Sequence, residues 1–105
     1  MKKWLIIAFL PVVLVAQEKG SITGTVTNGK TKEPLVGVNV MVKGTYYGAA
    51  TGLDGHYFIE NVNKGSYDIE ASIIGYKVVL QTGIRVESGQ KTVLNFPMEE
   101  TVLTL

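Results

Sequence analysis

The stretch that decides the fold is Val36-Gly37-Val38-Asn39-Val40-Met41-Val42-Lys43. Valine stands at every second position of this stretch. Because successive side chains of a strand point to opposite faces, the four valines share one face and the residues between them share the other. The stiff, β-branched valine side chain also suits a pleated surface. We therefore predict a β-strand that buries its valine face.

The same period-two alternation recurs on both sides of that stretch. Residues expected to share an inward face are Ile22, Gly24 and Val26; Tyr57 and Ile59; Tyr67, Ile69, Ala71 and Ile73; Tyr76, Val78 and Leu80; Ile84 and Val86; and Leu94, Phe96 and Met98. After the first sixteen residues there is no run of helical period. Many short strands at this spacing are typical of two packed sheets. The sequence therefore predicts an all-β, seven-stranded antiparallel β-sandwich.

Turn residues separate the predicted strands. The pair Asp54-Gly55 readily adopts positive φ, and the Asp54 side chain is expected to accept a hydrogen bond from the turn backbone. Gly65 and Gly75 stand at other breaks in the alternation, and Gly37 is a further candidate turn residue at the start of the valine stretch. We predict that these five residues have a structural role in turns, and that Gly55 and Gly75 resist substitution if their φ is positive.

The order and spacing of these residues resemble a known family. The matching pieces are Gly24-Thr25-Val26, Pro34-Leu35-Val36-Gly37-Val38-Asn39-Val40, Thr51 with Asp54-Gly55-His56-Tyr57, Gly65-Ser66-Tyr67 and Gly75-Tyr76. The set resembles the carboxypeptidase regulatory-like domain, a transthyretin-like (prealbumin-like) sandwich, which implies a Greek-key order of strands. Such domains often stand at the N-terminus of TonB-dependent outer-membrane receptors of bacteria related to Bacteroidetes. One departure is Gly52, where the family usually has an acidic residue.

The first sixteen residues have the pattern of a secretory signal peptide. Two lysines follow Met1, and the apolar run from Trp4 to Ala16 is shorter than the roughly 20 residues of a membrane-spanning helix. Polar Gln17 comes directly after that run. We therefore predict a helical signal peptide at 1–16, a sandwich domain at 17–98 and an extended tail at 99–105.

The predicted tail reads Glu99-Glu100-Thr101-Val102-Leu103-Thr104-Leu105 and contains no turn residue. Pro97, just before it, disfavours a central paired strand because proline cannot donate to the ladder. We expect the tail to find no sheet partner within the chain. It resembles the stretch that links this domain to the plug in receptors of this kind.

Charge and composition exclude several classes of function. Ten Lys and Arg stand against nine Asp and Glu without a basic patch, which argues against nucleic acid as a partner. The chain has no cysteine and one histidine, His56, so neither a clustered metal site nor a Ser-His-Asp triad is indicated. Asp68 and Glu70 share one strand face, as solvated acids do. We predict no catalytic, cofactor-binding or metal-binding residues and no enzyme activity.

The candidate binding loop contains Tyr46 and Tyr47, two adjacent aromatic residues between predicted strands. Two neighbouring rings cannot both face one core, so we expect at least one to be exposed. An exposed ring can stack on a sugar or on a partner protein, and loops carry binding more often than strands do. The alternative is that one ring covers an end of the sandwich and the other is a scattered surface residue.

Two functional interpretations follow. In the first, the chain is a non-catalytic exported accessory domain, the periplasmic N-terminal extension or a fragment of a TonB-dependent outer-membrane receptor. Its partners would be the receptor plug and barrel or another envelope protein, and it would meet the membrane only through the larger receptor. In the second, it is a free-standing secreted module that binds a glycan or a protein through Tyr46 and Tyr47.

Overall fold

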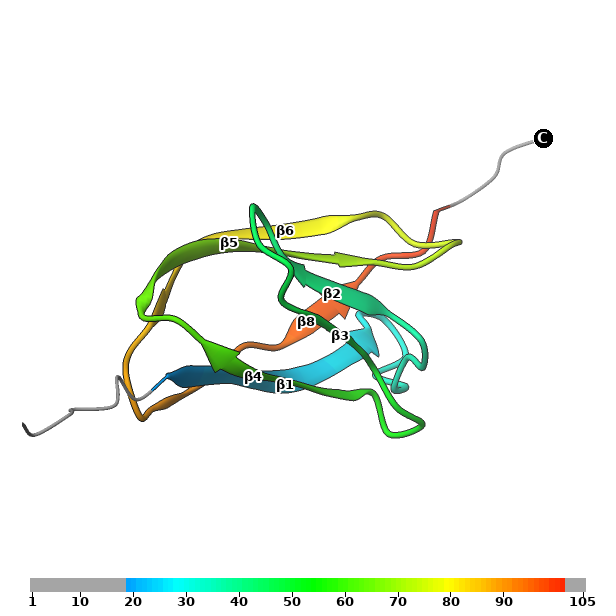
Figure 1. The fold of residues 1–105 in the computed structure, drawn as a ribbon. Coiled ribbons are helices and arrows are strands. Elements are labelled where there is room, and N and C mark those ends of the chain that lie inside the picture. Colours follow the sequence, from blue (N-terminus) through cyan, green and yellow to red (C-terminus); the bar gives the residue numbers. More distant parts are fainter. Residues whose placement is uncertain (1–18, 102–105) are drawn as a thin grey trace, which may run out of the picture.

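The computed structural model describes residues 19–101, which form eight β-strands and, within that range, no helix. The strands are β1 (Gly20–Asn28), β2 (Asn39–Val42), β3 (Gly48–Ala50), β4 (His56–Val62), β5 (Gly65–Ser72), β6 (Val79–Val86), β7 (Lys91–Val93) and β8 (Phe96–Met98). Figure 1 shows them as two layers, with β5 and β6 in one and β1 and β4 in the other. The predicted signal peptide, residues 1–16, lies outside the described residues.

Each layer is a four-stranded sheet. One has the order β4-β1-β7, with β8 also paired to β1, and the other has the order β3-β2-β5-β6. The chain passes repeatedly between them, because β1, β4, β7 and β8 belong to one sheet and the strands between them to the other. The all-β sandwich predicted from the sequence is confirmed.

The prediction of seven strands in wholly antiparallel sheets is wrong. There are eight strands in the described range, and β1 pairs in parallel with β7 over Ser21–Thr23 and with β8 over Val26–Asn28. β7 reaches β1 from the opposite sheet, after β6, rather than through a hairpin, so it is free to run in the direction of β1. β8 follows β7 and runs in the same direction. The link between them stays close to β1, because the Leu94 amide donates to the Thr23 carbonyl oxygen at 2.8 Å.

The core lies between the two sheets. Its buried apolar members are Ile22, Val26, Val38, Val40, Val42, Tyr57, Ile59, Val62, Ile69, Ala71, Val86, Phe96 and Met98. Phe96 is the largest fully buried side chain, and its ring centroid lies 6.1 Å from that of Tyr57. The alternation predicted for β1, β2, β4 and β5 therefore places the expected residues inside, although Tyr67 is only partly buried.

Two predicted inward residues face solvent on β6 and its approach. Val78 is 59% exposed and Leu80 is 50% exposed. After the turn at Gly75, the ladder sets Val79 opposite buried Ala71, so the alternation begins one residue out of phase with the prediction. A bulge at Gly83 then restores the expected phase. The expectation that Val78 and Leu80 point inward is thus wrong, because the start of β6 is shifted by one residue relative to the predicted alternation.

Val36 also differs from its prediction, since it is 53% exposed rather than inward. Gly37 has a φ of +78° and turns the chain immediately before β2. The strand alternation therefore begins only at Val38. A local pattern of alternating valines does not reveal where such a turn cuts it.

The beginning of the tail has a sheet partner, contrary to expectation. Glu100 forms an antiparallel bridge with Tyr76. The Lys77 amide donates to the Glu99 carbonyl oxygen at 2.8 Å, and the Thr101 amide donates to the Gly75 carbonyl oxygen at 2.9 Å. In the turn after β5, the Gly75 carbonyl and the Lys77 amide are therefore available to pair with residues 99–101. The rest of the predicted tail, residues 102–105, lies outside the described residues.

Candidate functional site

The candidate binding loop is the tight connection between β2 and β3, residues 43–47. The Thr45 hydroxyl donates to the Val42 carbonyl oxygen at 2.8 Å and accepts from the Tyr47 amide at 3.0 Å. The Val42 amide in turn donates to the Tyr47 carbonyl oxygen at 3.0 Å, and Gly44 has a φ of +77°. These contacts fix the loop by its own short-range hydrogen bonds, as polar turn residues do.

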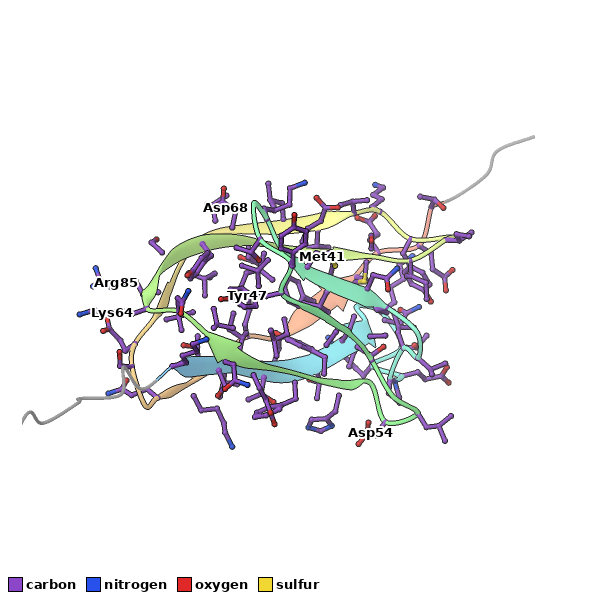
Figure 2. All side chains as sticks on the ribbon, viewed as in Figure 1. Met41, Tyr47, Asp54, Lys64, Asp68 and Arg85 are labelled. Atoms are coloured by element: carbon purple, nitrogen blue, oxygen red, sulfur yellow. The ribbon has the colours of Figure 1, made fainter. Side chains whose placement is uncertain are left out.

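The two tyrosines of this loop differ in their surroundings. Tyr46 is fully exposed, whereas Tyr47 is partly buried and packs against the core (Figure 2). One ring therefore anchors the loop to the sandwich and the other stands in solvent. A role of Tyr46 in binding stays a prediction.

The outer face of β2 and β5, which leads up to this loop, is mixed in chemistry. Met41 on β2 is 42% exposed, and Lys43 forms an ion pair with Glu70 of β5 at 3.1 Å. An exposed ion pair of this kind contributes little to stability. The loop itself offers an exposed aromatic ring, and the strands before it offer a thioether and a pair of charges, groups that suit a flat, partly polar ligand or a protein side chain.

The Asp54 turn is held by a hydrogen bond between the Asp54 side chain and the backbone of the same turn. Asp54 Oδ1 accepts a hydrogen bond from the His56 amide at 3.0 Å, and Oδ2 lies 3.3 Å from His56 Nδ1. The His56 amide first, and the nearby imidazole after it, hold the pKa of the Asp54 carboxyl below its usual value. Both side chains face solvent, and Figure 2 shows Asp54 at the opposite edge of the molecule from Asp68.

Three of the four predicted turn glycines have positive φ, namely Gly37, Gly55 and Gly75. Gly55 is also confined, because a Cβ there would lie 2.7 Å from the Val26 carbonyl oxygen. Gly65 differs from the prediction. It is the first residue of β5, and the turn between β4 and β5 lies just before it, at residues 63–64.

Thr51 has a role that the sequence analysis did not assign. It is 4% exposed, and its hydroxyl donates to the Leu35 carbonyl oxygen and accepts from the Val38 amide at 2.9 Å. The Gly37 amide donates to the Thr51 carbonyl oxygen at 2.9 Å. Thr51 thus holds the irregular segment 35–38, which leads into β2, in place by hydrogen bonds. The one signal in the sequence was the position of Thr51 in the spaced set of residues that resembles the family. Its hydrogen-bond partners could not be predicted, because they are remote in sequence.

Replacing Thr51 by valine is expected to destabilise the domain by about 1–3 kcal/mol, because the isosteric change leaves the buried Val38 amide and the part-buried Leu35 carbonyl without their partner. Chemical denaturation measures this loss. Thr82→Val serves as the control, since Thr82 is exposed on a strand, and it should change stability by less than about 0.5 kcal/mol. Equal losses in the two variants would contradict the role assigned to Thr51.

Residues 19–101 contain no candidate metal site and no candidate membrane-spanning helix. No group of three or more His, Cys, Asp and Glu side chains in that range could hold a metal ion. No helix there is both long and apolar enough for a membrane span.

Comparison with known proteins gives one family and one receptor. The carboxypeptidase regulatory-like domain matches residues 21–99. "TonB-dependent receptor P3" of Formosa agariphila is 40% identical over 76 residues, which cover 68% of this chain and 7% of the receptor. The chain therefore spans only a small part of that relative's length.

Two solved structures show the same fold at low identity. A type II cohesin–X-dockerin complex of Acetivibrio cellulolyticus matches with a TM-score of 0.65 and 17% identity, over 75% of this chain and 56% of that one. A putative carbohydrate binding protein of Bacteroides uniformis matches with a TM-score of 0.60 and 19% identity, over 77% of this chain and 41% of that one. At these identities the likeness concerns the fold alone.

Proposed function

The chain belongs to the carboxypeptidase regulatory-like domain family, and on that premise we propose that it is a non-catalytic, exported accessory domain at the N-terminus of a TonB-dependent outer-membrane receptor. The observation that carries this proposal is the 40% identity to 76 residues of a TonB-dependent receptor. The domain would lie in the periplasm beside the outer membrane. Its partners would be the plug, the barrel or another envelope protein.

The arrangement of the sandwich suits this place in a longer chain. Figure 1 shows the start of β1 and the segment after β8 at opposite ends of the molecule. A domain whose two ends lie far apart can continue into a following domain at one end while its N-terminal end points away from that domain.

An antiserum against residues 17–98 tests the proposal in the source bacterium. We expect it to detect, in the outer-membrane fraction, a polypeptide much larger than the 11.4 kDa of this chain. The N-terminal sequence of that polypeptide should begin at or near Gln17. Detection of only a small species in the culture medium would favour a free-standing module instead.

A secreted module that binds carbohydrate or protein is the second candidate function. The fully exposed ring of Tyr46 favours it, because exposed aromatic side chains on a fixed loop are suited to stacking. A likeness in fold to a structure described as a putative carbohydrate binding protein adds weak support.

Tyr46→Ala tests this second function. If the loop binds a glycan, the variant should lose binding on a glycan array while its melting temperature stays that of the parent, since the ring is fully exposed. Tyr47→Ala is the matched comparison. It should lower stability by about 1–2 kcal/mol, because part of its ring packs on the core. Absence of glycan binding by the parent domain would leave the receptor extension as the better proposal.

A further inference from the structure

Three segments that are remote in sequence meet at the end of the sandwich where the described chain leaves. They are the loop 28–31 after β1, the turn 75–77 after β5 and the segment 99–101 after β8. Figure 1 shows the last of these running beside the turn between β5 and β6. The backbone of 99–101 is tied to 75–77 by the two hydrogen bonds described above.

The centre of this meeting point is the Asn28 side chain, which is 7% exposed. Asn28 Nδ2 donates to Glu100 Oε1 at 2.9 Å and to the Tyr76 hydroxyl at 3.2 Å. Asn28 Oδ1 accepts from the Lys30 and Thr31 amides at 2.9 and 3.1 Å. Both ends of the amide group are thus occupied, one by its own loop and the other by the outgoing chain.

The segment that Asn28 holds is attached by polar contacts alone. Met98 is 1% exposed and is the last core residue, whereas Glu99, Glu100 and Thr101 are all exposed. Lys77 adds an exposed ion pair with Glu99 at 3.5 Å. Detaching 99–101 would therefore remove exposed side chains and no member of the core, and water could replace the lost hydrogen bonds.

We propose that Asn28, Tyr76 and Glu100 form a clasp that fixes the outgoing chain to the sandwich and opens locally while the sandwich stays folded. When the clasp is closed, it sets the direction in which the chain leaves the domain. When the clasp is open, the chain can turn about a hinge that begins after Met98. Tension on the following chain would load the clasp first, because segments held by few, solvent-exposed hydrogen bonds open at lower free energy than the core. This inference concerns the domain itself and does not depend on the receptor proposal.

Asn28→Asp is a sharp test because it changes only one end of the side chain. The Oδ1 acceptor for the Lys30 and Thr31 amides is kept, while the donor facing Glu100 becomes a second carboxylate oxygen. Attraction turns into repulsion at the 2.9 Å contact. Hydrogen exchange followed residue by residue should then show at least tenfold faster exchange at the Thr101 and Lys77 amides, with protection in β1 and β5 unchanged.

The control is Asn95→Asp, which adds the same charge. Asn95 Oδ1 accepts from the Thr25 amide and hydroxyl, and within the described part of the chain its Nδ2 donates no hydrogen bond. Asn95→Asp should leave exchange at Thr101 as in the parent. Adding Glu100→Gln to Asn28→Asp should restore slow exchange, because the new amide can donate to the new carboxylate.

Glu100→Ala provides a second route, since Glu100 is exposed and its removal leaves the core intact. It should speed exchange at Thr101 and Lys77 in the same local way. The proposal is overturned if Asn28→Asp and Asn95→Asp act alike, or if Glu100→Ala leaves Thr101 protected. It is also overturned if both clasp variants accelerate exchange throughout the sandwich, because the clasp would then belong to the cooperative core.

Discussion

Replacing Gly24 by alanine is expected to destabilise the domain by about 2–4 kcal/mol, although it adds only one methyl group in the middle of β1. A Cβ at this position would lie 1.8 Å from the Leu94 carbonyl oxygen and 2.7 Å from the Leu94 carbonyl carbon. These are backbone atoms, so no side-chain rotation relieves the clash. The link between β7 and β8 would have to move away from β1.

That movement has a further cost. The Leu94 amide donates to the Thr23 carbonyl oxygen, and the buried Tyr57 hydroxyl donates to the Leu94 carbonyl oxygen. Burial raises the pKa of Tyr57 above its usual value, so this hydroxyl keeps its proton for that bond well into the alkaline range. Shifting Leu94 strains both hydrogen bonds. The loss is large against the roughly 5–15 kcal/mol that stabilises a small domain.

Urea denaturation of Gly24→Ala beside Gly52→Ala measures the effect. At Gly52 an added Cβ would have Asp54 Oδ1 as its nearest atom, at 3.6 Å, which is an ordinary contact. Gly52→Ala should therefore change stability by less than about 0.5 kcal/mol. A Gly24→Ala domain as stable as this control would mean that the β7–β8 link does not lie against β1.

The parts of the fold that could be predicted are the strands in which every second residue is apolar. Ile22 and Val26 in β1, and Val38 and Val40 in β2, are all fully buried, because a strand places every second residue on one face whatever its partners are. The Asp54 turn was equally predictable, since its hydrogen bond spans two residues.

The parts that could not be predicted depend on distant partners. The parallel pairing of β1 with β7 and β8 is set by how the chain crosses between sheets, which no local pattern records. The phase of β6 depends on the turn at Gly75 and on the bulge at Gly83, where Asp68 Oδ1 accepts from the Gly83 amide at 3.1 Å. Asp68 was interpreted only as a solvated acid.

In the candidate sites, too, features set by neighbouring residues could be predicted and features set by distant residues could not. The exposure of one tyrosine could be predicted from the adjacency of Tyr46 and Tyr47. The contacts of Asn28 could not, because Tyr76 and Glu100 lie 48 and 72 residues away along the chain. A polar side chain that joins remote segments looks, in the sequence alone, like any other polar turn residue.

Replacing Val40 by aspartate is expected to prevent folding at neutral pH. Val40 is 0% exposed on β2, which lies between β3 and β5, and it is paired across the sheet with Ala49 and Ala71. A carboxylate there would lose its water without gaining a partner, at a cost of several kcal/mol, about as large as the whole stability of the domain. Circular dichroism should show no cooperative melting transition.

The defect should lessen as the pH falls. A buried carboxyl has a raised pKa, so the folded variant would bind its proton more tightly than the unfolded chain does. Because the native state then holds more protons than the unfolded state, stability decreases as pH rises through this range and recovers as pH falls. Val40→Asn lacks the titrating group, so its defect should not change with pH for this reason.

Met41→Asp, one residue further along β2, separates the two faces of the strand. Met41 is 42% exposed and stands opposite Glu70, so the variant should fold and lose about 1 kcal/mol, from repulsion between like charges across the strand pair. If Met41→Asp unfolded the domain and Val40→Asp melted like the parent, the inward face of β2 would be the wrong one. Because Val38 and Val42 share the face of Val40, the outward position of Met41 would then fail as well. The buried core and the exposed outer face of β2 therefore depend on the same one-residue register.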